Sequence, residues 1–367
     1  MPRQTYRGGY IVSTYTYSAG PGMLPKEVMQ EIQQHLLTFE YEGVSILETS
    51  HRSEAFQHVV DSLEVRLRRL MGIPRHYAVL WLQGGATLQF SMIPMNLSRC
   101  NRFAYVDTGV WSKKAMEDAR RFGEVEVIQP ISDEADGMSF DSRSAQDVDY
   151  LHVTLNNTIE GTRFTNIPEM DIPLVADASS NILAEKIDVE RFGVIYAGAQ
   201  KNIGPAGLTV VIIRRDLIQS LSLPSYLSYA SHEDKLLNTP ATFSMFTAER
   251  VLKWIEDRGG VEAMERLNRK KSEVVYSFLD RSNHFSSLVS GNRRSLTNIP
   301  FTTGDSEGDA AFQRFALERG LVELGGHRSV GGLRASLYNS MPLAGAVRLV
   351  DVMREFEEET YVSHQNI

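Results

Sequence analysis

Apolar runs of strand length alternate with amphipathic helical segments through about residue 220, and this alternation restricts the fold more than any other feature. Buried strands of a parallel sheet carry near-continuous apolar runs, because helices cover both faces of such a sheet. The sequence therefore predicts an α/β fold with a large, mostly parallel sheet flanked by helices. We expect strands within 77–83, 102–109, 124–129, 150–157, 172–180, 192–201 and 208–216, and helices within 25–39, 53–72, 84–97 and 112–123. Ser53 is expected to cap the second of these helices and Gly72 to end it.

A long amphipathic segment at 259–282 separates this alternation from a smaller C-terminal unit. The remaining residues indicate a strand at 295–303, a helix at 309–320, a strand at 332–340 and a final helix at 344–361. This order is typical of an α+β unit. We therefore expect a large domain at 16–259 and a small C-terminal domain at 260–367. No structure is assigned to residues 1–15, for which packing on the small domain and disorder both stay open.

The charge balance and the cysteine content narrow the class of partner. The net charge is −8, and an acidic surface attracts neither nucleic acid nor an acidic membrane. No apolar run approaches the roughly 18 residues of a membrane helix, and the N-terminus lacks the core of a signal peptide. The single cysteine, Cys100, excludes a disulfide within the chain and favours a reducing compartment. We expect a cytoplasmic protein that acts on small molecules, with no metal, nucleic acid or membrane as a partner.

Lys201 stands in the stretch YAGAQKNIGPAG, directly after an apolar run. A lysine in apolar surroundings has a lowered pKa and can act as a nucleophilic amine, for example toward pyridoxal phosphate. Taken alone, a lysine whose tip reaches solvent is the more common case. Asp177, which ends the run IPLVAD, changes that balance, because a carboxylate that keeps the ring nitrogen protonated is the second group this cofactor needs. A turn or cap role for Asp177 is equally common, so it is the pair that indicates the cofactor.

Three further stretches lie where expected strands end, the place where open α/β sheets bind ligands. The glycine turn and helix start in LQGGATLQF suit a phosphate, with Ala86 and Thr87 in the first turn, although many such turns carry paired glycines for geometry alone. Trp111, in VDTGVW, could stack on a flat ring or fill the core. Thr158, in NNTIEG, could hydrogen-bond a ring hydroxyl or serve as an ordinary turn residue.

Several arginines lie near turns and are candidates for binding anions. Arginine binds carboxylate and phosphate groups in a bidentate manner. Arg52 lies in TSHRS, and His327 and Arg328 lie between two glycine pairs in GGHRSVGG. Arg334 falls in a strand-like run, where an unpaired buried cation would be costly. Surface arginines usually serve only solubility, but the glycine pairs allow backbone and cations to crowd around an anion.

Seven stretches together closely resemble the phosphoserine aminotransferase family, a class V group of fold-type I pyridoxal-phosphate enzymes. They are SAGPGMLP, SHRS, NNTIEG, ADASS, YAGAQKNIGPAGLTVVI, LNTPATF and GHRSVGGLRASLYN. The resemblance runs from about Tyr17 to Phe356, nearly the whole chain. GAQKNIGPAG and the GHRSVGGLRAS region are specific to this family, whereas the aspartate–lysine pair is shared across the fold type. The resemblance implies pyridoxal 5′-phosphate as cofactor and a homodimer with active sites at the subunit interface.

The resemblance also implies a role for each candidate residue. Lys201 would be the Schiff-base lysine, and Asp177 the partner of the pyridine nitrogen. The other implied cofactor residues are Ala86, Thr87 and Gln200 at the phosphate, Trp111 stacked on the ring, Thr158 at the phenolic oxygen, and Asn238 and Thr239 reaching the phosphate from the other subunit. The implied substrate residues are Arg334 at the α-carboxylate and Arg52, with His327 and Arg328 from the neighbour, at the distal phosphate or side-chain carboxylate.

The implied reaction is a ping-pong amino transfer between L-glutamate and 3-phosphohydroxypyruvate, which gives O-phospho-L-serine and 2-oxoglutarate in serine biosynthesis. Some relatives also use 4-phosphohydroxy-L-threonine in vitamin B6 synthesis, and the sequence does not decide this. One departure from the family pattern is visible. Some members carry an arginine where Thr87 stands, so the anion site here is expected to be one cation lighter.

Three alternatives stay open. A serine–glyoxylate-type aminotransferase would use the same fold. A cysteine desulfurase is disfavoured, because its cysteine lies on a mobile loop whereas Cys100 leads into an expected strand. A non-catalytic α/β protein could bind a nucleotide phosphate at GGATLQF with Lys201 in a structural role, but it would leave Asp177 and the arginines as coincidences.

Overall fold

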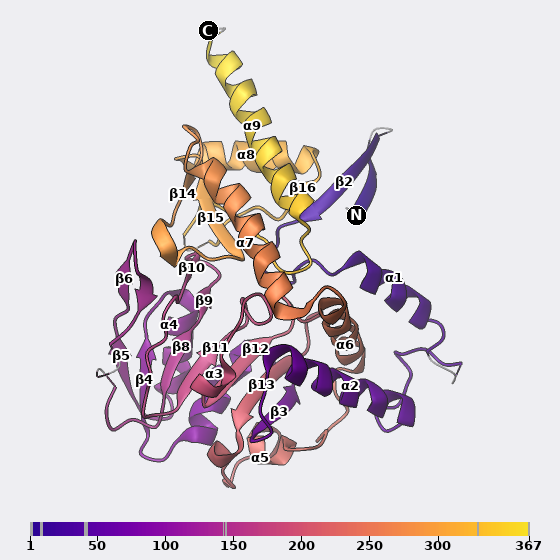
Figure 1. Cartoon of the computed structure of the whole chain (residues 1–367), viewed down its shortest axis with the longest axis vertical. Coiled ribbons are helices and arrows are strands. Elements are labelled where there is room, and N and C mark those ends of the chain that lie inside the picture. Colours follow the sequence, from indigo (N-terminus) through magenta and orange to yellow (C-terminus); the bar gives the residue numbers. More distant parts are fainter. Residues whose placement is uncertain are drawn as a thin grey trace.

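A seven-stranded sheet forms the core of the larger part of the molecule, in the lower half of Figure 1. The computed structural model describes residues 3–7, 10–39, 43–141, 143, 145–328 and 330–365. The strands are β3 (Tyr77–Leu82), β4 (Arg102–Val106), β5 (Glu124–Ile128), β8 (Leu151–Thr154), β11 (Leu174–Asp177), β12 (Val194–Gly198) and β13 (Thr209–Arg214). Their order is β3-β13-β12-β11-β8-β4-β5, in which β13 runs antiparallel to both neighbours and the other pairs are parallel. The predicted mostly parallel sheet is confirmed.

Helices cover both faces of this sheet, with an apolar cluster on each side. They are α1 (Lys26–His35), α2 (Glu54–Met71), α3 (Gly85–Leu97), α4 (Val110–Ala119), α5 (Tyr229–His232) and α6 (Thr242–Asp257). The sheet face that carries Ala176 and Ile195 packs against α1, α2 and α6. The opposite face, with Val175 and Tyr196, packs against α3 and α4. Neighbouring residues of a strand point to opposite faces, so both are buried and the runs are almost wholly apolar.

Local signals fix the ends of α2 as predicted. The Ser53 Oγ accepts a hydrogen bond from the Phe56 N–H at 3.3 Å, which satisfies one free donor at the start of the helix. Gly72 follows the last turn with φ of 66°, a left-handed conformation that glycine adopts without strain. The helix therefore begins two residues after Arg52, at Glu54, and fixes the end of that loop.

Two short hairpins extend from the large unit. They are β6 (Ile131–Asp133) with β7 (Gly137–Ser139), and β9 (Asn156–Asn157) with β10 (Thr162–Arg163). The β9–β10 hairpin follows β8 directly at the carboxyl end of the sheet, so its turn reaches the edge where ligands bind.

The C-terminal part forms a smaller unit around a second apolar cluster. Its elements are α7 (Gly260–Leu279), β14 (Ser286–Ser287), β15 (Asn298–Thr302), α8 (Ser306–Glu318), β16 (Leu321–Val322), β17 (Leu333–Ser336) and α9 (Leu343–Gln365). An N-terminal hairpin of β1 (Arg3–Arg7) and β2 (Tyr10–Thr16) joins it, since β2 pairs with β16 and Tyr15 lies opposite Leu321. The sequence assigned no structure to residues 1–15.

The long helix α7 contacts both units. Val261 and Met264, near its start, belong to the large apolar cluster. Val275 and Phe278, near its end, belong to the second cluster. The division of the chain after residue 259 stays a prediction, and the helix that follows it packs on both sides of that division.

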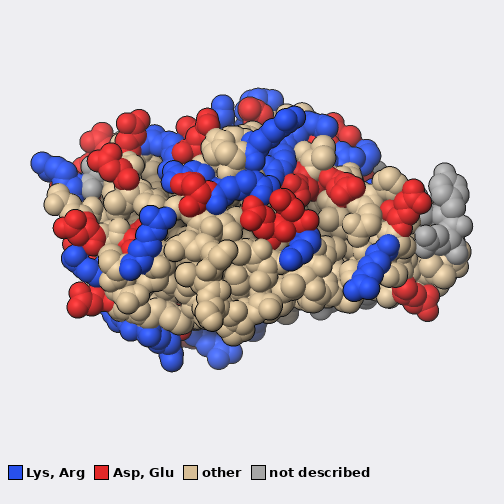
Figure 2. All heavy atoms as spheres, turned by 90° about the horizontal axis from the view of Figure 1, so that it is seen from below, with Lys and Arg blue, Asp and Glu red and all other residues tan. Residues whose placement is uncertain are grey.

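The surface has a mixed charge. On the face drawn in Figure 2, acidic and basic side chains are interspersed around a broad area of uncharged residues. Within the described part of the chain, no helix combines the length and the apolar character needed to cross a membrane.

Candidate active site

Lys201 lies in the turn that follows β12, at the carboxyl end of the sheet. Its Nζ donates a hydrogen bond to Thr158 Oγ1 at 2.8 Å. Burial lowers the pKa of Lys201 to about 8, an effect that the Asp177 carboxylate opposes and the Arg334 guanidinium reinforces. Much of the amine is therefore neutral near pH 8, and a neutral amine can act as a nucleophile or a base.

Asp177 ends β11, the strand beside the one that leads to Lys201. Its side chain is buried, and its Oδ1 accepts a hydrogen bond from the Ser179 N–H at 2.9 Å. Burial raises the pKa of Asp177, against the hydrogen bonds from Ser179 and Tyr196 and the charge of Lys201. A buried carboxylate of this kind is stabilised by a cationic partner, and a protonated ring nitrogen would be one.

The turn between β9 and β10 joins several groups of the site. Thr158, which receives the Lys201 hydrogen bond, is buried in this turn. Its carbonyl oxygen also accepts a hydrogen bond from Arg334 Nη1 at 3.5 Å. Two residues further, Glu160 Oε1 accepts a hydrogen bond from the Val110 N–H at 2.8 Å, at the start of α4. One hairpin therefore positions the amine, the arginine and the helix that carries Trp111.

Two predicted site residues hold buried polar atoms without a hydrogen-bond partner among the described residues. These atoms are Trp111 Nε1 and Arg334 Nε. Burial lowers the pKa of Arg334, and the charges of Tyr338 and Glu160 oppose that shift. A half-buried cation without a partner is costly unless an anion neutralises it. The Arg334 guanidinium therefore suits a ligand carboxylate.

The start of α3 suits a phosphate group. Gly84 and Gly85 have φ of 91° and 67°, and no side chain caps the helix. The first N–H groups of a helix and its dipole favour an anion. Ala86 and Thr87 lie in this first turn, and the Thr87 side chain is exposed. Thr87 therefore stands at the open edge of the turn, where a relative's arginine would add a cation.

Asn238 lies beside the same turn. Its Nδ2 donates a hydrogen bond to Gln83 Oε1 of its own chain at 3.1 Å, directly before the glycine pair. Thr239 follows it and is exposed. The resemblance implied that Asn238 and Thr239 act on the other subunit's phosphate, and that assignment stays a prediction.

The segment that contains SAGPG covers Lys201, a contact that the sequence did not predict. Gly22 N–H donates to the Gln200 carbonyl at 2.7 Å. A Cβ on Gly20 would lie 3.8 Å from Lys201 Cγ, and one on Gly22 would lie 2.8 Å from a ring carbon of Tyr338. The glycines of this stretch are the sequence feature that could have predicted the contact, because they allow its backbone to lie close to Lys201 and Tyr338.

The remaining predicted anion-binding residues lie on two other loops. Arg52 is exposed in the loop before α2. His327 and Arg328 lie at the tip of a loop that Gly326 closes, because its N–H donates to the Gly332 carbonyl at 3.0 Å. Arg334 lies at the base of that loop. Within the described contacts, none joins Arg52 or Arg328 to Lys201, so their roles stay predictions.

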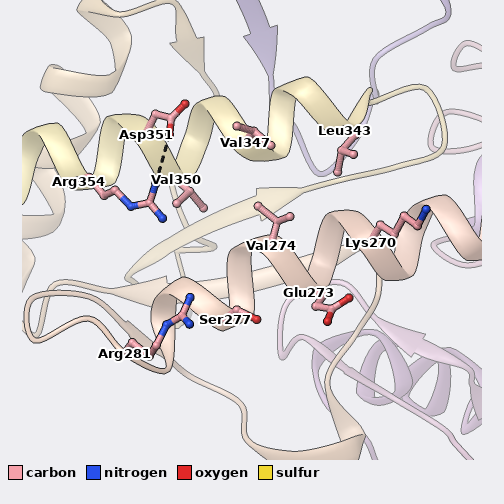
Figure 3. A pocket seen from close by; sticks show the side chains of 10 residues that line it. All are labelled: Lys270, Glu273, Val274, Ser277, Arg281, Leu343, Val347, Val350, Asp351 and Arg354. Carbon is pink, nitrogen blue, oxygen red and sulfur yellow. Dashed lines mark hydrogen bonds and ion pairs between the residues drawn. The ribbon is translucent and has the colours of Figure 1, made fainter.

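A groove of about 530 Å³ lies elsewhere, between α7 and α9 (Figure 3). Val274, Val347 and Val350 line it, and Lys270, Glu273, Arg281 and the Asp351–Arg354 ion pair surround them. None of these lining residues is a predicted site residue. The sheet end around Lys201 is therefore the candidate active site.

Comparisons with known proteins show the family to which the chain belongs. The family model for class V aminotransferases matches residues 14–349. A phosphoserine aminotransferase from an Exiguobacterium species is 80% identical over 97% of this chain and all of that relative. One from Bacillus cereus is 51% identical over 94% of this chain and 98% of that relative.

Two solved structures of phosphoserine aminotransferases superpose closely. The one from Bacillus circulans has a TM-score of 0.90 at 40% identity, and the PLP-bound one from Trichomonas vaginalis has 0.87 at 34%; they cover 95% and 93% of this chain and 99% of theirs.

The chain therefore belongs to the class V aminotransferase family, within its phosphoserine aminotransferase group. It is a pyridoxal-phosphate-dependent enzyme, and the residues present fit that cofactor. Asp177 offers a buried carboxylate for the ring nitrogen, Thr158 offers a hydroxyl, and the start of α3 offers free N–H groups for a phosphate. Lys201 offers an amine with a lowered pKa.

Proposed function

We propose that this enzyme transfers the amino group of L-glutamate to 3-phosphohydroxypyruvate, giving 2-oxoglutarate and O-phospho-L-serine. The observation that carries the proposal is at Thr158. Its hydroxyl accepts a hydrogen bond from the Lys201 amine, and its carbonyl oxygen accepts one from the Arg334 guanidinium. A substrate carboxylate bound to Arg334 would hold the substrate Cα beside the Lys201 amine. The names of the relatives, at up to 80% identity, support phosphoserine as the product.

Each group of the site has a separate task. Pyridoxal phosphate, when bound, supplies a protonated ring that stabilises negative charge at the substrate Cα. Asp177 holds the proton on the ring nitrogen, and Trp111 would stack on the ring. Thr158 would hydrogen-bond the ring hydroxyl when its own hydroxyl is no longer bonded to the Lys201 amine. The neutral Lys201 amine would carry the proton from the substrate Cα to the cofactor in the first half-reaction, and from the cofactor to the Cα of the product in the second.

The substrates share an anionic tail, which one site must accept in two forms. Glutamate carries a carboxylate, and 3-phosphohydroxypyruvate carries a phosphate. We assign this tail to Arg52 together with His327 and Arg328, because guanidinium groups bind both anions. These side chains lie on separate loops of one chain, so we propose that His327 and Arg328 come from a second subunit.

A homodimer is the assembly that we propose. The stretch before Arg52 exposes Leu37 at 83% and Leu47 at 60% of their surfaces, with Val44 at 40%. Clustered exposed apolar side chains often mark an interface between proteins. A partner that covers this stretch would lie next to Arg52 and would complete the anion site. The lone Cys100 is free, and we place the enzyme in the cytoplasm, a reducing compartment.

A spectroscopic half-reaction tests the proposed function. The purified holoenzyme is recorded in the visible range, then with glutamate, then with 3-phosphohydroxypyruvate. We expect glutamate to bleach the yellow band and 3-phosphohydroxypyruvate to restore it. Serine with glyoxylate is the comparison pair for the rival aminotransferase. A band that responds only to serine and glyoxylate would replace the proposed substrates while keeping the fold and cofactor.

A further inference from the structure

Two buried polar side chains, His152 and Tyr196, lie beside Asp177 in the layer between the sheet and α3. Tyr196 on β12 and His152 on β8 flank β11, which carries Asp177. His152 Nε2 lies 2.8 Å from Tyr196 Oη. Tyr196 lies beside Asp177 in the register of the parallel strands β12 and β11, and its hydroxyl is one of the groups that oppose the rise in the pKa of Asp177. Both rings are buried on the sheet face that packs against α3 and α4.

The directions of these hydrogen bonds follow from the groups themselves. An ionised carboxylate accepts only, so the Tyr196 hydroxyl can stabilise the charged form of Asp177 only by donating to it. That hydroxyl then accepts from His152, which carries its proton on Nε2. Burial lowers the pKa of His152 to about 3, so the ring is neutral. Its Nδ1 has no hydrogen-bond partner among the described residues. A buried N–H without an acceptor is rare, so we place the ring proton on Nε2 and leave Nδ1 unprotonated.

The ring of His152 is held by packing as well as by this bond. It stacks on Tyr105 with ring centres 4.8 Å apart and planes 24° apart. Buried polar groups in an apolar layer are costly unless each one is satisfied. A phenylalanine at 196 and an aliphatic residue at 152 would fill the same space without that cost. The polar pair therefore calls for a role beyond packing.

We propose that Tyr196 and His152 are positioning residues for the cofactor: they orient Asp177 and keep its carboxylate ionised against the ring nitrogen. The inference rests on the proposed role of Asp177. Each hydrogen bond to a carboxylate favours its charged form, and burial alone would favour the neutral acid. Without the Tyr196 hydroxyl, the carboxylate would become more basic and would compete for the proton, so the ring nitrogen would hold that proton less tightly.

The test reads the ring nitrogen directly. Holoenzymes are prepared with pyridoxal phosphate labelled with ¹⁵N in the ring, and the nitrogen NMR shift and the cofactor dissociation constant are measured. We expect Tyr196→Phe to move the nitrogen shift toward the value of an unprotonated ring. The same variant should raise the cofactor dissociation constant and lower kcat by about 10-fold each, with KM for glutamate little changed. His152→Leu should change the nitrogen shift, the cofactor dissociation constant and kcat in the same directions, but by smaller amounts. His152→Gln should restore them, because its amide N–H can donate to Tyr196.

Tyr150→Phe is the matched control, because its buried hydroxyl meets Tyr105 Oη at 2.7 Å rather than Asp177. It should leave the nitrogen shift unchanged. The inference is wrong if Asp177→Asn moves the shift while Tyr196→Phe and His152→Leu keep the wild-type value. If Asp177→Asn also leaves the shift unchanged, the role assigned to Asp177 fails first and the inference fails with it. The His152→Leu and His152→Gln pair carries the test if Tyr196→Phe does not fold.

Discussion

Lys201 is the residue to which we assign the central chemistry, and the environment of its amine sets the pH at which that amine can react. Its lowered pKa, about 8 against an ordinary 10.5, means that the proton leaves within the working range. Capture of pyridoxal phosphate by the apoenzyme requires the neutral amine. The capture rate should therefore rise with pH and reach half its maximum near pH 8.

Two substitutions check the sign of this effect. The Arg334 charge lowers the pKa of Lys201, so Arg334→Gln should move the midpoint of capture to higher pH. The Asp177 charge raises that pKa, so Asp177→Asn should move the midpoint to lower pH. Stopped-flow absorbance of apoenzyme mixed with cofactor measures the rate. A wild-type midpoint near 10.5 would show that Lys201 is not in the environment described.

Removal of the amine should abolish amino transfer. We expect Lys201→Ala to lower kcat by roughly 1,000-fold or more, because the base that moves the Cα proton is lost. Lys270→Ala, at an exposed position on α7, is the matched control and should keep wild-type activity. Steady-state formation of 2-oxoglutarate measures both variants. Appreciable turnover by Lys201→Ala would contradict the assignment.

At this scale, the sequence predicted the residues whose chemistry is unusual for their place. Lys201 and Asp177 end apolar runs, and the structure places them on adjacent strand ends. Tyr196 and His152 were not predicted as functional, because aromatic residues inside a strand are indistinguishable from core residues. Only the three-dimensional neighbourhood shows that their polar atoms meet one another.

Among the elements, the glycine-closed loop before β17 has the most demanding backbone. A Cβ on Gly326 would lie 2.0 Å from the Gly331 carbonyl oxygen, so any side chain there would force the loop open. We expect Gly326→Ala to raise KM for 3-phosphohydroxypyruvate by about 10-fold or more, since the tip carries Arg328, while cofactor affinity stays unchanged.

The neighbouring glycine provides a control for this loop. A Cβ on Gly325 would come no closer than 3.4 Å, to the mobile end of the Gln313 side chain. Gly325→Ala should therefore keep a near wild-type KM. Equal KM values for the two variants would remove the loop from substrate binding.

Elements with clear periodicity were predicted, and those without it were not. The strands of the central sheet and α2 with its caps follow their apolar pattern. Helix α6 was missed because residues 244–249 are all buried, which hides the helical period. The pairing of β2 with β16 was missed because it joins residues some 300 positions apart, and local patterns do not encode such pairing.

For the whole molecule, the proposed sharing of the site between subunits makes a distinctive prediction. Lys201→Ala and Arg328→Ala homodimers should each be inactive or severely impaired. If Arg328 acts on the neighbour's site, a mixed dimer holds one site with both residues intact. Dissociating and remixing equal amounts should then recover about a quarter of the wild-type activity.

The same experiment decides the alternative arrangement. If Arg328 acts in the site of its own chain, every site of a mixed dimer lacks one residue, and no activity returns. Activity is followed after size-exclusion chromatography, which also reports the oligomeric state. The sequence predicted this assembly only through resemblance, because a subunit interface leaves no periodic pattern and one chain alone does not display it.

The most direct test of the account is a comparison of amino acceptors with ¹⁵N-labelled glutamate as donor. The purified holoenzyme is given 3-phosphohydroxypyruvate, glyoxylate or pyruvate in turn, and the labelled amino acid is quantified by mass spectrometry. The account predicts labelled O-phosphoserine, with kcat/KM for 3-phosphohydroxypyruvate at least roughly 100-fold above that for either unphosphorylated acceptor. Equal or greater transfer to glyoxylate or pyruvate would contradict it.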